Sequence, residues 1–149
     1  MQVDKIKRKA KIVMSNSNKL NVNFFLSQHS ESHSGCETVF DIVNSQNSFI
    51  PLEDNVTKDI IFISKDQLMM VELSVNEYVS RIDPNKARIQ IEMINNEKID
   101  GYVFIDMPQI KSRVSDYFNI FHQFVCIYKD QGDLILNKAY ILSVKEITM

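Results

Sequence analysis

Glycine, cysteine and long apolar runs are all scarce in this chain. Only three glycines occur among its 149 residues, which excludes a glycine-rich loop of the kind that cradles phosphates. The two cysteines, Cys36 and Cys126, do not suggest the disulfide framework of a small secreted domain, so we expect two free thiols. No segment approaches the roughly 20 apolar residues of a membrane-spanning helix, and we expect no contact with a membrane.

An excess of charge of one sign is also missing. With 17 basic and 19 acidic residues the net charge is −2, which is too small to attract a polyanion over a distance. Nucleic-acid-binding modules usually have a basic face and a high isoelectric point, whereas the isoelectric point here is about 5.9. The beginning of the chain is charged where a signal peptide would be apolar, which predicts a cytoplasmic protein.

What the chain does contain is typical of a soluble globular protein. Apolar residues make up 44% of it and charged residues 24%, and a chain of this length buries about 68–70% of its unfolded surface. Length and composition therefore predict either one domain of ordinary size or two very small units that share an interior.

A repeat favours the second of these possibilities. Five blocks recur in the same order, and most aligned positions are apolar in both: 9–12 with 86–89, 19–26 with 98–105, 38–44 with 113–119, 49–54 with 124–129, and 61–72 with 134–145. This pattern predicts a tandem duplication, with a first unit over 1–73, a linker over 74–85 and a second unit over 86–149. Because the linker is short, we expect one compact body.

Each unit begins with a pattern typical of a β-hairpin. In the second unit Ile89, Ile91 and Met93 alternate with polar residues, which is the period of a strand with one buried face. The sequence INNEK that follows is typical of a turn, and the first unit has SNSNK at the same place. We therefore expect hairpins at the start of both units.

A short helix is expected next in each unit. In the second copy Val114, Phe118 and Phe121 are spaced as one stripe of a helix, with Tyr117 beside them. The remaining apolar segments are rich in aliphatic and aromatic residues and predict two further strands per unit. The order in each copy is strand, strand, short helix, strand, strand.

The ends of these helices also have recognisable residues. Ser112 is a plausible N-cap, and Asp116 lies in the first turns, where a carboxylate interacts favourably with the helix dipole. Asp41 has the same place in the first copy. Asn44 and Asn119 end the two helices, where we expect a residue that tolerates the left-handed conformation.

The fold class predicted is mainly β with short helices, that is, α+β. A unit of four strands and one helix leaves a sheet face or edge unprotected, and exposed edges invite aggregation. A second copy would cover it. We expect a pseudo-twofold arrangement of the two homologous units, either a sandwich or a partly closed barrel.

The second copy resembles an uncharacterised family of small bacterial domains. Its pattern is a hairpin with Gly-x-Val or Gly-x-Leu, then Arg-Leu-Ser-Asp-x-Leu-Asn, Phe-Leu-x-Leu and a closing Ile-x-x-Val-x-Glu. The residues here that match, Glu146 one place late, are Gly101, Val103, Arg113, Val114, Ser115, Asp116, Phe118, Asn119, Phe124, Val125, Ile127, Ile141, Val144 and Glu146. The first copy departs from the pattern at Val22, Thr38 and Phe40. The resemblance implies an architecture and no activity.

The densest polar cluster lies in residues 28–37. His29, His33 and Cys36 include ligand types that Zn²⁺ accepts, but their spacing matches no closed structural zinc pattern, and serine and glycine favour a solvated loop. As a nucleophile Cys36 would need a base held at hydrogen-bond distance. We favour the loop and expect no metal, cofactor or catalytic residue, with a metal site or an enzyme as the alternative.

The beginning of the chain is the most basic segment. Lysine and arginine side chains there could contact phosphates, but we favour a solvated lead into the first strand, because no matching basic face is evident elsewhere. The residues are Lys5, Lys7, Arg8, Lys9 and Lys11.

These observations favour a non-enzymatic protein-interaction or regulatory adaptor module. Arg113, Asp116, Tyr117 and His122 would form the partner-binding surface, because segments that lead from a loop into a helix are common recognition sites. Arg113 and Asp116 could equally be a surface ion pair. A nucleic-acid-binding β-barrel remains an alternative, and a homo-oligomer is possible.

Overall fold

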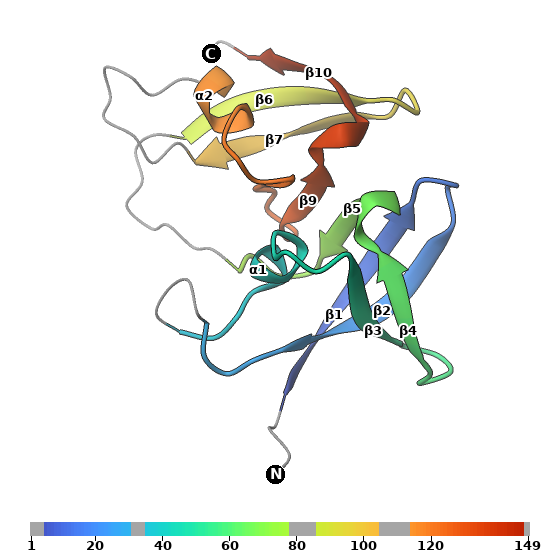
Figure 1. Ribbon diagram of the computed structural model, residues 1–149. Coiled ribbons are helices and arrows are strands. Elements are labelled where there is room, and N and C mark those ends of the chain that lie inside the picture. Colours follow the sequence, from blue (N-terminus) through green and yellow to red (C-terminus); the bar gives the residue numbers. More distant parts are fainter. Residues whose placement is uncertain (1–4, 31–34, 78–85, 105–113, 148–149) are drawn as a thin grey trace.

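A computed structural model describes residues 5–30, 35–77, 86–104 and 114–147 (Figure 1). As predicted, the chain is mainly β, with two sheets and a few short helices. The first half contains β1 (Ile6–Met14), β2 (Lys19–Leu26), α1 (Val39–Val43), β3 (Phe49–Asp54), β4 (Ile60–Ser64), the 3₁₀ turn η1 (Lys65–Gln67) and β5 (Leu68–Leu73). The second contains β6 (Lys86–Met93), β7 (Lys98–Phe104), α2 (Val114–Phe118), β8 (Phe124–Ile127), β9 (Leu134–Asn137), η3 (Lys138–Tyr140) and β10 (Ile141–Glu146).

Both predicted hairpins are confirmed. β1 pairs with β2 and β6 pairs with β7, each in an antiparallel register. Ser17 and Asn96 have φ values of 73° and 72° in the two connecting turns, where short polar residues tolerate positive φ best. The alternation in β6 is also as expected, because Ile89, Ile91 and Met93 are buried.

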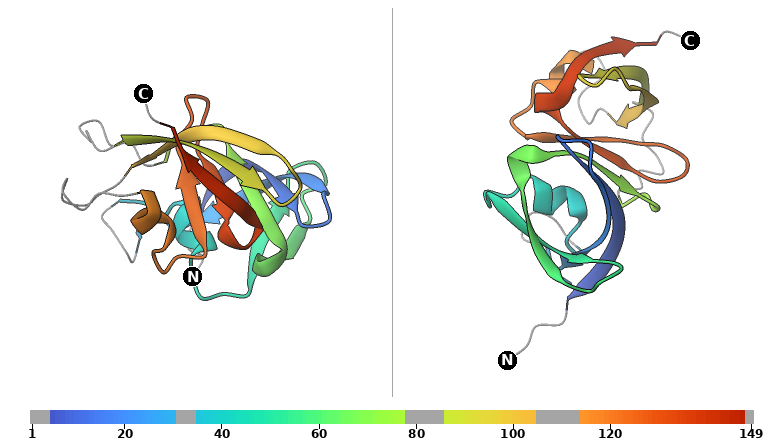
Figure 2. Two further views of the ribbon diagram at one scale, coloured as in Figure 1. Left: turned by 90° about the horizontal axis from the view of Figure 1, so that it is seen from above. Right: turned by 90° about the vertical axis from the view of Figure 1, so that its right-hand side faces the viewer.

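The strands form two sheets, and the larger one includes strands of both halves. The larger sheet has the order β4-β3-β2-β1-β5-β9-β8, and the smaller has the order β10-β6-β7. An isolated bridge between Tyr102 and Tyr128 connects β7 to the end of β8. Figure 1 shows β5 and β9 side by side between the two halves, and Figure 2 shows each half curled on itself.

The apolar interior consists of two clusters, whereas the sequence suggested one shared interior. The first is built mainly from β1 to β5 and α1, and the second mainly from β6 to β10 and α2. Each also takes side chains from the other half: Phe124 and Ile135 belong to the first cluster, and Met69 and Met70 to the second. Two cores result because each half curls around its own helix.

The predicted helical stripe of the second half is wrong at its last residue. α2 ends at Phe118, and Phe121 lies beyond it with a relative exposure of 103%. The reason is tertiary, because the Nζ of Lys138 donates to the backbone oxygens of Phe118 and Ile120. This contact satisfies carbonyl groups that another helical turn would otherwise use.

The expected left-handed helix ends are also wrong. Asn44 has φ −96°, and the residues with positive φ other than glycine in the described ranges do not include Asn119. At the other end of α1, Thr38 and Asp41 form a capping box, although Thr38 departs from the family pattern. Ser112 lies outside the described residues. No helix in the described ranges is long and apolar enough to cross a membrane.

Gly132 allows the close approach of β9 to β5. A Cβ atom there would lie 2.0 Å from the backbone oxygen of Leu73, and φ is +145°. We expect Gly132→Ala to lower the free energy of unfolding by roughly 2–5 kcal/mol through strain and overlap, as measured by urea denaturation. Gly35→Ala is the matched control, because Gly35 also has a positive φ (+101°) but nothing within 4 Å. Equal losses in the two variants would contradict the close approach.

Candidate protein-binding surface

The contact between β5 and β9 joins the two halves. Three antiparallel residue pairs are formed, and they are Met70 with Leu136, Val71 with Ile135 and Glu72 with Leu134. The ladder continues where the N–H of Leu73 donates to the backbone oxygen of Asp133 at 3.0 Å. The halves are therefore connected by backbone hydrogen bonds as well as by apolar packing.

Two side chains of the second half fill the first core. Phe124 of β8 and Ile135 of β9 are fully buried there. Asn44, just after α1, holds β8 in place, because its Oδ1 accepts from the N–H of Phe124 at 2.9 Å and its Nδ2 donates to the Phe124 oxygen at 3.4 Å. Asn44 is thus a residue of the junction, a role that its expected helix-ending conformation did not suggest.

A buried carboxylate lies at the beginning of α1. The side chain of Glu77 is 3% exposed and forms an ion pair with the Nη1 of Arg8 at 2.9 Å, and it accepts from the N–H of Val39 at 2.8 Å. Burial raises the pKa of Glu77, and the contacts with Val39 and Arg8 oppose that shift. Glu77 lies in the predicted linker, where no sequence signal distinguished it from other acidic residues.

Two further titratable side chains near the junction, Tyr117 and Cys126, are structural. The hydroxyl of Tyr117 donates to the backbone oxygen of Cys126 at 2.8 Å and accepts from its N–H at 3.1 Å. Burial raises the pKa of Tyr117, and it also raises the pKa of the Cys126 thiol well above its usual value. Cys126 is therefore a protonated thiol in the interior, which is unsuited to nucleophilic chemistry.

An exposed apolar surface lies on the outer face of β3 and β4. We call it the β3–β4 patch, and it consists of Phe49, Pro51, Ile60 and Phe62. Phe49 and Phe62 have relative exposures of 58% and 66%, and Pro51 is opposite Phe62 in the ladder, on the same face. Among the described strands β4 is the last of its sheet, so its outer backbone groups have no strand beside them.

The helix surface expected from the sequence is only partly accessible. His122 is exposed, and its ring lies edge-on to that of Phe40 at 5.7 Å. Asp116 is half-buried, and Tyr117 packs against the second core with its hydroxyl bound to the backbone. Arg113 lies outside the described residues, and a partner-binding role for this surface remains a prediction.

The loop with His29, His33 and Cys36 is described only in part. His29 is exposed and Cys36 is half-buried, while His33 lies outside the described residues. Within the described ranges no three histidine, cysteine or acidic residues are close enough together to hold a metal ion. A metal site that includes His33 remains a prediction.

The basic residues at the beginning of the chain lie within a strand, not in a lead into one. Except for Lys5, they belong to β1. Lys7 contacts Glu53 at 3.1 Å and Arg8 contacts Glu77, while Lys9 and Lys11 are exposed. Two of the four basic side chains in β1 are thus paired with carboxylates.

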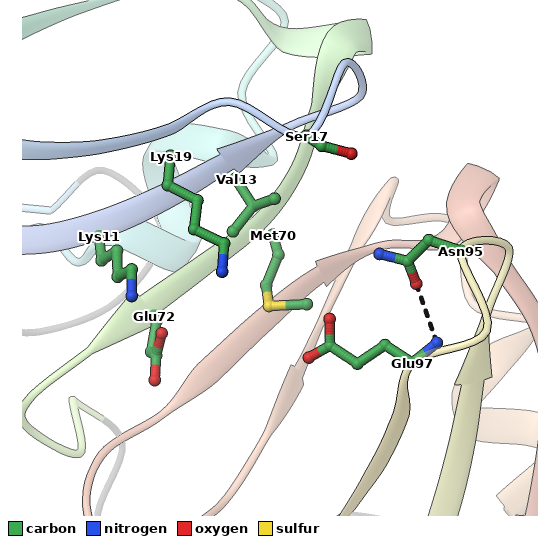
Figure 3. Close-up of a pocket in the computed structure, with 8 residues that line it drawn as sticks. All are labelled: Lys11, Val13, Ser17, Lys19, Met70, Glu72, Asn95 and Glu97. Atoms are coloured by element: carbon green, nitrogen blue, oxygen red, sulfur yellow. Dashed lines mark hydrogen bonds between the residues drawn. The ribbon is translucent and has the colours of Figure 1, made fainter.

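A shallow cleft of about 290 Å³ separates the β1–β2 hairpin from the β6–β7 turn (Figure 3). Its two lysines and two glutamates have equal and opposite charge. The lining residues are Lys11, Val13, Ser17, Lys19, Met70, Glu72, Asn95 and Glu97. Its polar residues are all exposed. This cleft has none of the convergent buried polar groups that fix a small ligand.

Comparison with family models, with curated proteins and with solved structures finds no match to this chain.

The Asn44 contact can be tested with a matched pair of variants. We expect Asn44→Ala to lower the free energy of unfolding by about 1–3 kcal/mol, because it leaves the buried N–H of Phe124 without a partner. Asn47→Ala is the control, because Asn47 is an exposed asparagine in the same segment after α1. Urea denaturation measures both. Similar losses would show that Asn44 does not hold the halves together.

The pH dependence of stability tests the buried carboxylate. Because burial raises the pKa of Glu77 above its ordinary 4.5, the folded protein binds this proton more tightly than the unfolded chain does. The associated stability is present below pH 4.5 and is lost as pH rises through the folded pKa. We expect wild-type stability to fall relative to Glu77→Gln from pH 4.5 toward neutrality. Parallel denaturation profiles for the two proteins would contradict this.

Proposed function

We propose that this chain is a non-enzymatic protein-interaction module that binds its partner through the β3–β4 patch. The observation that carries the proposal is the exposure of Phe49 and Phe62 at 58% and 66%, next to the free edge of β4. An edge strand presents unpaired N–H and C=O groups that can pair with another chain. Natural edge strands are usually protected by charged residues or proline, and β4 has neither.

The patch is large enough to contribute usefully to binding. Covering the exposed parts of two phenylalanine rings removes on the order of 200 Å² of apolar surface from water. At about 25 cal/mol per Å² this contributes roughly 5 kcal/mol before the entropic cost of association. The alternative of nucleic-acid binding has less support, because Lys7 and Arg8 are paired with carboxylates.

A tandem duplication accounts for the architecture behind this surface. In the first half the strand order is β4-β3-β2-β1-β5. In the second the order is β9-β8-β7-β6-β10 if the Tyr102–Tyr128 bridge is counted. Side-chain contacts also support a duplication. Lys65 and Lys138 lie at matching places, and each donates to a backbone oxygen just after a helix. Lys65 donates to Ser45, and Lys138 donates to Ile120.

Strand registers correct one part of the sequence alignment. Met14 pairs with Leu68, and Met93 pairs with Ile141, which makes Met14 and Met93 counterparts. Residues 9–12 therefore match 88–91, two places later than the similarity to residues 86–89 suggested. The sequence alignment failed there because short basic and aliphatic runs resemble each other in several registers.

The duplication we propose is head-to-tail and not pseudo-twofold. A twofold axis would bring equivalent strands together, whereas β5 pairs with β9, whose counterpart in the first half is β4. The curl of each half favours a partly closed barrel over a sandwich of two flat sheets (Figure 2).

The proposal is tested by affinity purification from the native host. We expect the wild-type chain to recover a protein at constant stoichiometry, and Phe62→Asp to lose it, because a charge replaces the exposed ring at the centre of the patch. Val56→Asp is the control, because Val56 is an equally apolar side chain, 81% exposed, in the turn between β3 and β4. Recovery that is indifferent to Phe62→Asp would remove the patch from the proposal.

A further inference from the structure

Two strand edges remain free in the described part of the chain, and they are complementary. The larger sheet ends in β4 and β8, and the smaller ends in β10 and β7. The Tyr102–Tyr128 bridge joins β7 to the end of β8, which leaves β4 and β10. In the repeat, β4 is the counterpart of β9 and β10 is the counterpart of β5. β5 and β9 pair with each other inside the chain. The free edges of β10 and β4 therefore correspond to the two strands of that pair, but neither edge has a partner strand in the described ranges.

Two side chains of β3 and β4 that correspond to buried side chains of β8 and β9 are exposed. Phe124 and Ile135 are fully buried where the second half meets the first. Their counterparts are Phe49 and Phe62, the two most exposed rings of the β3–β4 patch. The first half thus has the same apolar surface that the second half uses at the junction, and nothing within the described chain covers it.

The same relation holds at the other edge. Met69 of β5 is 3% exposed and belongs to the second core. Its counterpart in β10 is Leu142, which is 61% exposed. Apolar side chains from both sides of the internal junction therefore recur exposed at the two free edges, although the counterpart of Met70 is the polar Ser143.

We propose that β4 of one copy of this chain pairs with β10 of a second copy and repeats the β5–β9 junction between molecules. The inference rests on the proposed function, because it names a second copy as the partner of the β3–β4 patch. Each chain has one edge of each kind, so the contact is heterologous and leads to a closed ring or to a filament.

The register of the contact follows from the internal one. Met70 lies opposite Leu136 and Glu72 lies opposite Leu134, so their counterparts place Ser143 opposite Ile63 and Lys145 opposite Ile61. Phe62 then lies opposite Val144. This pair corresponds to the internal pair of the buried Ile135 and Val71.

The backbone of β10 is oriented for this pairing. The N–H of Ile147 donates to the backbone oxygen of Arg88 in β6 at 2.9 Å. Because successive N–H groups in a strand alternate in direction, the N–H groups of Val144 and Glu146 point away from β6. These are the donors that a neighbouring β4 would need.

One further hydrogen-bonding pair is expected beyond the strands. Asn44 binds both backbone groups of Phe124, and its counterpart Asn119 is exposed, with its side-chain amide donating to the backbone oxygen of Ser115. In the assembled state Asn119 would bind the backbone of Phe49 from the second copy in the same way.

The intermolecular ladder ends at Ile60 of β4. Asp59 is the counterpart of Gly132, where a Cβ atom would overlap the opposite backbone. The strands must therefore separate beyond Ile60, and the contact is confined to residues 60–63 of β4 and 143–146 of β10, which include the counterpart of the Leu73–Asp133 hydrogen bond.

Disulfide cross-linking tests the register directly. Chains with Ser143→Cys and chains with Ile63→Cys are mixed and oxidised, both with Cys36→Ser. These positions form a pair that is not hydrogen-bonded, in which the Cα atoms lie about 4.5 Å apart, within the range of a disulfide. We expect a cross-linked dimer that contains one chain of each kind. Replacing the second partner by a Phe62→Cys chain is the off-register control, because that side chain points to the opposite face.

The mass in solution provides an independent measurement. We expect the wild-type chain to form either a ring with a discrete multiple of its 17.3 kDa or a filament whose mass rises with concentration, as measured by light scattering over a wide range of concentration. Phe62→Asp and Leu142→Asp should each shift the mass to that of the monomer, while Val56→Asp should leave the assembly intact.

Several outcomes would overturn the inference. A wild-type monomer at every concentration, or the absence of the mixed cross-link, excludes the contact. Cross-linking of Ile63→Cys chains with one another indicates a symmetric β4–β4 contact instead. If the wild-type chain is monomeric and still captures another protein in a Phe62-dependent manner, the further inference fails while the proposed function stands. If neither assembly nor capture depends on Phe62, both fail.

Discussion

The antiparallel contact between β5 and β9 is the interaction on which the rest of the structure depends. It contains only three residue pairs, yet it places Phe124 and Ile135 in the first core and Met69 and Met70 in the second. Neither half can complete its own core without the other. Burial of these apolar side chains supplies the driving force, and the backbone hydrogen bonds fix the register in which burial occurs.

The short helices depend on the same kind of long-range contact. A helix of five residues is not stable by itself in water. α1 is held at its beginning by the carboxylate of Glu77, and the carbonyl of Ser45 just after it accepts from Lys65. α2 is held in a related way by Lys138. Their lengths are therefore set by side chains from distant parts of the sequence, and helical propensity contributes little.

The arrangement of the halves also explains the character of the surface. Pairing β5 with β9 protects two edges, and the Tyr102–Tyr128 bridge joins β7 to the end of β8, so β4 and β10 remain at the outer ends of the described sheets. The head-to-tail duplication proposed above would have this property, because each added unit covers one edge and contributes another. Exposed phenylalanines beside an uncharged edge strand invite aggregation in water, and the partner proposed for that edge would cover them.

The sequence by itself determined the features that depend on neighbouring residues. Alternation predicted the two hairpins, and the positions of Ser17 and Asn96 are turns because short polar residues tolerate positive φ there. The buried position of Glu77 was not predictable in this way, because no local signal distinguished it from other acidic residues. Phe49 and Phe124 hold the same place in the sequence alignment of residues 49–54 with 124–129, but one is exposed and the other is buried. Only the tertiary structure decided between them, because the burial of a side chain depends on which distant segment packs against it.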